Sequence, residues 1–157
     1  MDLVATPEPA VESAELAARL RLTVTRLARL MRQQTDTGLS PTLLASLATV
    51  ESCGPLTLGE LATREQVAPP TITKAVSGLE EQGLVVRRVD PDDRRVVRVE
   101  VTAEGRRLLE SARTRKNAWL ARRLRGLDPA DLERLTAALD ALERLTAAAE
   151  GERAARR

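Results

Sequence analysis

Apolar residues first recur with a helical period near the N-terminus. They are spaced by three or four positions, which is the repeat of one face of an α-helix. Ser13 can cap this helix, with Glu15 in its first turn. We therefore predict a long helix over 13–36, preceded by a flexible tail over 1–12. Its apolar positions are Leu16, Leu20, Val24, Leu27 and Met31.

A second helix is marked by its start and stop signals. Ser40-Pro41 places a capping hydroxyl directly before a proline, which is a favoured order at a helix start. Leucine and valine then recur with helical spacing. Cys53-Gly54-Pro55 interrupts that pattern. We predict one helix between these two signals.

Two further helices follow, separated by a turn. Thr57 and Glu60 have the three-residue spacing of a capping box, which predicts that a short helix starts at Thr57. Pro69 and Pro70 fit only the first turn of a helix, so they mark the start of the next one. Residues 57–82 therefore have the layout of a helix-turn-helix.

A β-hairpin is predicted over residues 84–101. Valines alternate with charged residues from Val97 to Val101, which is the period-two pattern of a half-buried strand. The apolar stretch at the start of the segment can pair with it. Between them, Asp90-Pro91-Asp92-Asp93 suits a four-residue loop with a type I turn, because proline is favoured at its second position. A hairpin that follows a helix-turn-helix forms the wing of a winged helix.

Two long helices complete the chain. Thr102 can cap a helix that reaches about Arg125, and Asp128-Pro129 can start the last one, whose leucines recur along one side. We expect residues 149–157 to be a tail. The predicted fold class is therefore mainly α with a small β-hairpin wing, which is a winged helix-turn-helix flanked by long helices.

Composition narrows the classes of function. The 157 residues include no histidine, so the usual neutral-pH base and the commonest metal ligand are missing. The sequence shows no metal-ligand cluster, glycine-rich phosphate loop or nucleophile–base set, so we expect no enzyme, no cofactor and no bound metal. No apolar run approaches the roughly 18 residues of a membrane span, and the N-terminus lacks a signal-peptide pattern. A soluble cytoplasmic protein without a membrane partner is expected.

The predicted wing combines arginines and aspartates at its tip. Residues 84–101 hold five arginines and four acidic residues, so the wing is nearly neutral. Asp93 lies two residues before Arg95 and can accept the fork of its guanidinium. Held in this way, Arg95 would suit a narrow and electronegative DNA minor groove. The arginines then left for phosphates are Arg87, Arg88 and Arg94.

These motifs together resemble the MarR family of bacterial transcription regulators. The segment PDDRRVVRVEVTAEG resembles the family's Asp-x-Arg hallmark, followed by alternating apolar residues and Thr-x-x-Gly. The segment LTLGELATREQVAPPTITKAVSGLEEQGLVVRR resembles its helix-turn-helix, with Thr73-Lys74 where a Thr-Arg pair is usual and Gly78 where a basic residue is frequent. The resemblance covers roughly residues 13–148 and is strongest over 56–105.

The resemblance implies a homodimer whose outer helices, over 13–36 and 102–148, intertwine. Its two winged lobes would read a pseudo-palindromic operator in double-stranded DNA. It also implies a repressor that a small-molecule effector or an oxidant releases. Asp93 would hold Arg95, which would enter the minor groove. The residues that would shape the start of the recognition helix or approach bases are Pro69, Pro70, Thr71, Thr73, Lys74 and Ser77.

Three features have a structural interpretation beside the functional one. Trp119, the only aromatic residue, either lines an effector pocket or belongs to the core. Because the chain has no other aromatic ring, we expect an effector pocket to be aliphatic, with an arginine for an anionic ligand. Cys53, the only cysteine, could sense peroxide, but it lacks nearby basic residues in sequence, which favours a structural role. The leucine stripes could bind a foreign helix, although a symmetric second copy is favoured.

A second class of function stays open: a winged-helix module that binds a protein instead of DNA. Residues 39–83 carry two basic and five acidic residues, which is unfavourable for phosphate contacts. Residues 102–126 carry eight basic and two acidic residues, so they and the wing would supply the attraction, unless they form only a solvated face. Salt dependence separates the two classes, because phosphate contacts weaken steeply with ionic strength.

Overall fold

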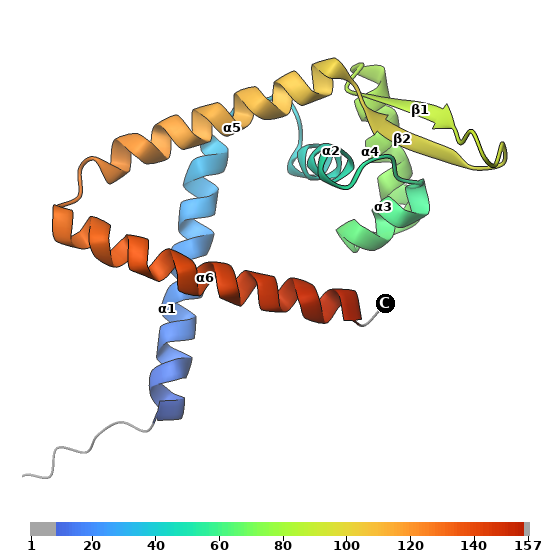
Figure 1. Cartoon of the computed structure of the whole chain (residues 1–157). Coiled ribbons are helices and arrows are strands. Elements are labelled where there is room, and N and C mark those ends of the chain that lie inside the picture. Colours follow the sequence, from blue (N-terminus) through green and yellow to red (C-terminus); the bar gives the residue numbers. More distant parts are fainter. Residues whose placement is uncertain (1–8, 156–157) are drawn as a thin grey trace, which may run out of the picture. The chain divides into compact units, whose positions relative to one another are not determined.

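The computed structural model describes residues 9–155, with the side chains of 13–148, as helices around one antiparallel hairpin (Figure 1). The helices are α1 (Pro9–Gln33), α2 (Pro41–Cys53), α3 (Leu58–Glu65), α4 (Pro69–Glu81), α5 (Ala103–Leu124) and α6 (Pro129–Ala155). The strands are β1 (Val85–Val89) and β2 (Val97–Val101). The order of elements is the predicted one, so the fold class of a mainly α protein with a β-hairpin wing is confirmed.

Helix α1 begins earlier than predicted. It starts at Pro9, so Ser13 lies inside the helix and the predicted tail over 1–12 is wrong for its last residues. Proline is favoured at the first helical position, because its fixed φ suits the helix and its missing N–H would have no partner there. Residues 1–8 of the predicted tail lie outside the described residues.

Helix α6 ends later than predicted. It continues to Ala155, so the prediction of a tail over 149–157 is wrong for most of that segment. The segment is rich in alanine, glutamate and arginine, which have high helix propensity, and the single Gly151 does not offset them. The last two residues of that tail, 156–157, lie outside the described residues.

The described chain divides into two compact units, with the boundary after Lys116 inside α5. The first unit holds α1 to α4, the hairpin and most of α5, whereas the second begins at Asn117 and holds the end of α5 with α6. In the second unit the Asp128 carboxylate accepts a hydrogen bond from the backbone N–H of Asp131 at 2.8 Å. This cap confirms the predicted start of α6 at Asp128-Pro129.

We call α2 to α4 with the hairpin the winged lobe, and it contains the core. Helix α4 turns one face inward, whereas its other face is exposed. Strand β2 adds Val99, and β1 adds Val85. The capping box of Thr57 and Glu60 is formed at the start of α3, as predicted. The buried side chains of the core include Leu47, Val50, Leu61, Ile72, Val76 and Leu79.

The hairpin is the predicted wing, but its loop is longer than predicted. The strands pair from Val85 with Val101 to Val89 with Val97, so the loop spans residues 90–96 and not only 90–93. Two consecutive turns build it. The Asp90 carboxylate accepts from the backbone N–H groups at its start, and the N–H of Val96 donates to the Asp93 carbonyl at 2.9 Å. This loop, the wing tip, is the end of the hairpin farthest from α5 (Figure 1).

Thr102 and Gly105 join the wing to α5. The Thr102 hydroxyl donates to the Gly83 carbonyl at 2.7 Å and accepts from the Gly105 N–H at 3.1 Å, so it caps α5 as predicted. Gly105 is buried, and a β-carbon there would lie 2.3 Å from the Leu84 carbonyl oxygen. The Thr-x-x-Gly motif therefore has a packing reason, because only glycine allows this close approach.

No helix among the described residues combines the length and the apolar character needed to cross a membrane.

Two glycine substitutions should change stability in opposite directions. Gly105→Ala forces a β-carbon against backbone, so we expect a loss of about 1–3 kcal/mol in the free energy of unfolding. Gly78→Ala, inside α4, meets only the Leu43 side chain at an ordinary 3.8 Å. Because alanine favours helix, a gain of about 0.5–1 kcal/mol is expected. Urea unfolding of both variants measures the pair, and equal effects would contradict the packing reason for Gly105.

Candidate nucleic-acid interface

Helix α4 begins with two prolines and without a side-chain cap. Its N-cap Ala68 has extended backbone (φ −63°, ψ 140°), and prolines occupy the first turn. Because proline has no N–H, these positions leave no backbone donor unpaired. The structure places Pro69 and Pro70 at the exposed start of α4, as the sequence predicts.

Three of the predicted base-reading residues lie on the outer face of α4. Thr71, Thr73 and Lys74 are exposed. The Thr73 hydroxyl donates to the carbonyl oxygen of Pro69 at 3.0 Å, so its proton is used within the helix and its oxygen is left to act as an acceptor. Within the described part of the chain, the Lys74 ammonium has no hydrogen-bond or ion-pair partner. It is the one cation on this face of α4.

Arg87 ties β1 to α4. Its Nη2 donates to the Ser77 hydroxyl oxygen at 3.1 Å, and its Nη1 lies 3.5 Å from the Glu80 carboxylate. The side chain is 33% exposed. Arg87 was expected to be left over for phosphates, whereas the structure engages it with the recognition helix. Ser77 is correspondingly half-buried and already accepts a hydrogen bond, so it is less accessible than the other residues predicted on this helix.

Arg88 is engaged more loosely. Its Nε lies 3.0 Å from Glu100, which stands on the neighbouring strand, and its side chain is 66% exposed. An exposed pair of this kind contributes little to stability. Arg88 can therefore exchange Glu100 for a phosphate at small cost, unlike Arg87.

The wing tip holds Arg95 as the sequence predicts. The Asp93 carboxylate accepts from Nε and Nη2 of Arg95, both at 3.1 Å, and from the Arg95 backbone N–H at 3.0 Å. The Arg95 side chain is nevertheless 91% exposed. These hydrogen bonds lower the pKa of Asp93, chiefly through the Arg95 side chain. The result is a guanidinium in one orientation at the outermost part of the lobe.

Arg94 stands beside this pair without a described partner. It is exposed, and its side chain makes no hydrogen bond or ion pair with any residue the structure describes. Arg94 and Arg95 thus present one free and one oriented cation at the wing tip. The Arg95 contact with Asp93 is established by geometry, and contact of either arginine with DNA stays a prediction.

A second arginine–aspartate contact at the wing is not apparent from the sequence. Arg98 on β2 donates through Nε to Asp90 Oδ2 at 2.5 Å, and its Nη1 lies 3.4 Å from Glu60 Oε2 on α3. The Arg98 side chain is the main cause that lowers the pKa of Asp90. The alternation of valine with charge indicates only that Arg98 faces away from the core. Its partners depend on strand register and on tertiary packing.

The basic stretch after the wing is partly neutralised within the protein. Arg113 on α5 pairs with Glu51 on α2, and Arg107 pairs with Glu104. Arg115 keeps its charge but donates to the Ser111 hydroxyl. Several positive charges that were expected to attract phosphate are therefore used inside the first unit. Arg106 is exposed, without a described partner, and lies in the first turns of α5.

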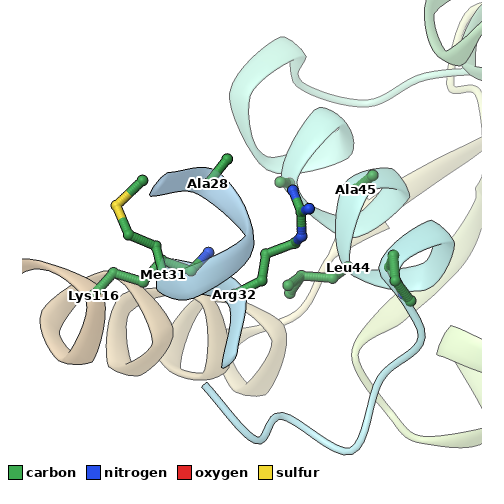
Figure 2. Close-up of a pocket in the computed structure, with 8 residues that line it drawn as sticks. Ala28, Met31, Arg32, Leu44, Ala45 and Lys116 are labelled. Carbon is green, nitrogen blue, oxygen red and sulfur yellow. The ribbon is translucent and has the colours of Figure 1, made fainter. Parts of the chain in front are cut away.

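A separate cavity of about 590 Å³ lies between α1, α2 and α5. Figure 2 shows Arg32 extending from α1 toward α2, with Lys116 contributed by α5. Apart from these two cations, its walls are apolar. The lining is thus aliphatic and contains an arginine, and the binding of an effector here stays a prediction. Its lining residues are Ala28, Met31, Arg32, Pro41, Leu44, Ala45, Ala48 and Lys116.

Trp119 and Cys53 have different surroundings. Trp119, in the second unit, is 8% exposed, and the Arg123 guanidinium lies 5.4 Å from its ring centroid. Cys53 is exposed at the end of α2, where its sulfur lies 3.7 Å from the Ser52 hydroxyl. Across the described residues, no three histidine, cysteine or acidic side chains are grouped so that they could hold a metal ion.

The pKa of each wing aspartate should depend mainly on a different arginine. Each carboxyl has a lowered pKa, mainly because of one arginine, Arg95 for Asp93 and Arg98 for Asp90. Arg95→Ala should raise the pKa of Asp93 toward its ordinary value of 3.8 and leave Asp90 low. Arg98→Leu should raise the pKa of Asp90 most, and change that of Asp93 less. Carboxyl ¹³C titration measures both, and parallel shifts of the two groups would contradict separate pairs.

The sign of the pH dependence follows from these lowered values. A carboxyl whose pKa is lower in the folded state contributes stability above its unfolded pKa and loses it as the pH falls through the folded value. The wing contacts should therefore be complete near neutral pH. They should disappear only below about pH 4, the ordinary range of aspartate.

Comparison with known proteins places these features in one family. The MarR family matches residues 39–97, which covers most of the winged lobe. The uncharacterized HTH-type transcriptional regulator Mb0904 of Mycobacterium bovis is 38% identical over 128 residues, which is 81% of this chain and 90% of that protein.

Solved structures agree with the sequence match. A proposed transcriptional regulator of Pseudomonas aeruginosa superposes with a TM-score of 0.77 at 32% identity, covering 89% of this chain and 98% of that one. A MarR family protein of Bacillus stearothermophilus gives a TM-score of 0.75 at 26% identity, with 90% and 99% covered. The chain therefore belongs to the MarR family and is a winged helix-turn-helix transcriptional regulator.

Proposed function

We propose that the protein is a homodimeric repressor that binds a pseudo-palindromic DNA operator and is released by a small anionic effector. One observation carries the DNA-reading part: Arg95 is 91% exposed and yet is oriented by the Asp93 carboxylate. An exposed ion pair contributes little to folding. Its benefit is therefore the presentation of the guanidinium to a partner outside the chain.

The lobe supports a division of contacts between two grooves. In this proposal the exposed start of α4 enters the major groove, where base edges are distinguishable. Arg95 enters the adjacent minor groove, and Arg88 and Arg94 contact phosphates. Arg87 holds the wing against α4 through its contacts with Ser77 and Glu80. The α4 residues in or beside the major groove are Pro69, Pro70, Thr71, Thr73, Lys74 and Ser77.

Exposed apolar side chains on the outer helices support the homodimer. On α1, Leu16 is 65% and Val24 51% exposed, and on α6, Leu145 is 61% exposed. Several apolar residues on one element are costly to leave in water. A second copy of the chain presents the same two helices, so a symmetric contact can cover both stripes.

The cavity between α1, α2 and α5 supports the effector. Arg32 and Lys116 can pair with an anionic group, while Met31 and Leu44 contact an apolar body. Because the walls come from three helices, a bound ligand alters the packing of α2 against α1. Trp119 stays a second candidate for ligand contact. A role as repressor is supported by a relative of that name, the HTH-type transcriptional repressor MdtR of Bacillus subtilis, which is 33% identical over 87 residues.

The acidic balance of residues 39–83 favours the alternative of a protein-binding module. The structure weakens that observation, because three of the five acidic side chains form ion pairs with arginines from outside this segment. Only Glu81 among them has no described contact. The engaged residues are Glu51 with Arg113, Glu60 with Thr57, Glu65 with Thr49 and Glu80 with Arg87.

DNA binding should depend on Arg95 in a sequence-dependent way. Fluorescence anisotropy with the duplex upstream of the protein's own gene, at about 50 and 200 mM salt, measures it. Arg95→Ala should weaken binding about tenfold on this duplex and less on a scrambled one. Arg94→Ala should weaken binding to both duplexes equally and lower the salt slope by about 1.

Arg134→Ala, on α6, serves as the control for loss of one exposed positive charge and should leave binding unchanged. Binding by the wild type that shows no preference for the native duplex, and no dependence on salt, would contradict DNA reading. It would favour the protein-binding alternative.

Dimerisation should depend on the exposed face of α1. The chain mass is 17.1 kDa, so light scattering of the wild type should report about twice that value. Val24→Glu places a charge in the proposed interface and should shift the mass toward the monomer. Val97→Glu is the matched control, because Val97 is similarly exposed, at 45%, but lies on the wing. A monomeric wild type would overturn the proposal.

A further inference from the structure

A continuous series of hydrogen bonds runs from α3 to the guanidinium of Arg95. Glu60 on α3 meets Arg98 on β2, and Arg98 donates to Asp90 at the start of the wing tip. Asp90 in turn accepts from the backbone N–H of Asp93 at 3.3 Å. The Asp93 carboxylate then holds Arg95. Each link is a direct contact between described atoms.

Asp90 uses its two carboxylate oxygens for different purposes. Oδ1 accepts from the backbone N–H groups of Asp92 and Asp93, which shapes the turn. Oδ2 accepts from Arg98 Nε at 2.5 Å. The Asp90 side chain is only 13% exposed, and that of Arg98 is 35% exposed. The turn that presents Asp93 is therefore connected to a side chain on the opposite strand.

Backbone pairing anchors only the base of the wing. Leu56 and Val99 exchange two backbone hydrogen bonds, at 2.7 and 3.2 Å, and Val99 is fully buried. Beyond that point the backbone of the hairpin pairs, among the described residues, only with itself, and Val97 and Val89 at its end are 45% and 58% exposed. Arg98 lies one residue from the anchored base and reaches both α3 and the wing tip.

We infer that Arg98 is a positioning residue for DNA reading: by binding Asp90 and Glu60 together, it fixes the wing tip, and hence Arg95, relative to the helix-turn-helix. Arg98 does not contact DNA in this role. Arginine suits the position because its planar fork donates in two directions, whereas a lysine ammonium is a single point charge. The inference rests on the proposed DNA-binding function and names a specificity-determining part of it.

The decisive variant is Asp90→Asn. Asparagine keeps an oxygen for the two turn N–H groups but places an NH₂ against Arg98 Nε, so the link breaks while the turn can persist. It also removes a negative charge near DNA. A purely electrostatic role predicts tighter binding to every duplex. Positioning predicts a loss of about two- to fivefold in the preference for native over scrambled DNA.

Asp92→Asn is the matched control. Asp92 is exposed, lies two residues away and carries the same charge, but no described residue contacts its carboxylate. It should not reduce the preference. An equal change in preference for the two variants would overturn the positioning role.

A double-mutant comparison tests whether the effect passes through Arg95. Arg98→Leu should lower the preference about two- to fivefold in the wild-type background and have no further effect when Arg95 is already alanine. Equal losses in both backgrounds would mean that Arg98 acts through general charge or folding, and would sink the inference.

Hydrogen exchange of the free protein separates failure of this inference from failure of the proposed function. The amides of Arg95 and Val96 are bonded to Asp93. In the free protein they should exchange faster in Asp90→Asn than in Asp92→Asn. If the wild type shows no operator preference but exchange changes as expected, the wing is positioned for another partner. Unchanged exchange in Asp90→Asn would refute positioning.

Discussion

The packing of strand β2 into the core of the winged lobe is the interaction on which the wing and the start of α5 depend. Val99 is fully buried, and its backbone pairs in both directions with Leu56, directly before α3. Three residues further, the Thr102 N–H donates to the Leu84 carbonyl at 3.0 Å and α5 begins. One short strand therefore closes the core, anchors the wing and sets the start of α5. A shift of β2 by one residue would expose Val99 and bury Arg98.

Several arginines of the first unit are structural links as well as positive charges. Arg87 connects the wing to α4, Arg98 connects it to α3, and Arg113 connects α5 to α2. These pairs lie at the surface, so each contributes little to the stability of the fold. Their larger effect is to restrict orientation, because the planar guanidinium binds acceptors along defined directions. The chain thus has many arginines but a low net charge of +2, and its paired arginines fix the positions of the few unpaired ones.

The sequence predicted contacts between residues that are close along the chain. The cap at Thr57 with Glu60 and the fork of Asp93 with Arg95 span three and two residues, so spacing and side-chain chemistry are sufficient to anticipate them. The wing loop was underestimated, because its length depends on the last strand pair, Val89 with Val97, which local propensity does not determine. The contact of Arg87 with Ser77 and Glu80 is likewise not predictable from spacing, because it depends on how β1 packs against α4.

Contacts between distant residues required the fold. Arg98 meets Glu60 across 38 positions, and Arg87 meets Ser77 only because β1 lies beside α4. The terminal helices illustrate the opposite limit. The residues near Pro9 and Ala155 are compatible with helix or coil. They are helical because extending an existing helix costs less than starting a new one, and local sequence does not show this.

Low net charge determines how such a lobe can achieve affinity. A strongly basic domain gains most of its DNA affinity from counterion release, which does not depend on sequence. Here, pairs within the first unit neutralise several cations, and Lys74, Arg94, the oriented Arg95 and the loosely paired Arg88 are left at the proposed interface. Weak long-range attraction keeps binding to random DNA low. The contrast between operator and other DNA then depends on whether these few groups match both grooves at once, which makes the rigidity of the wing a determinant of specificity.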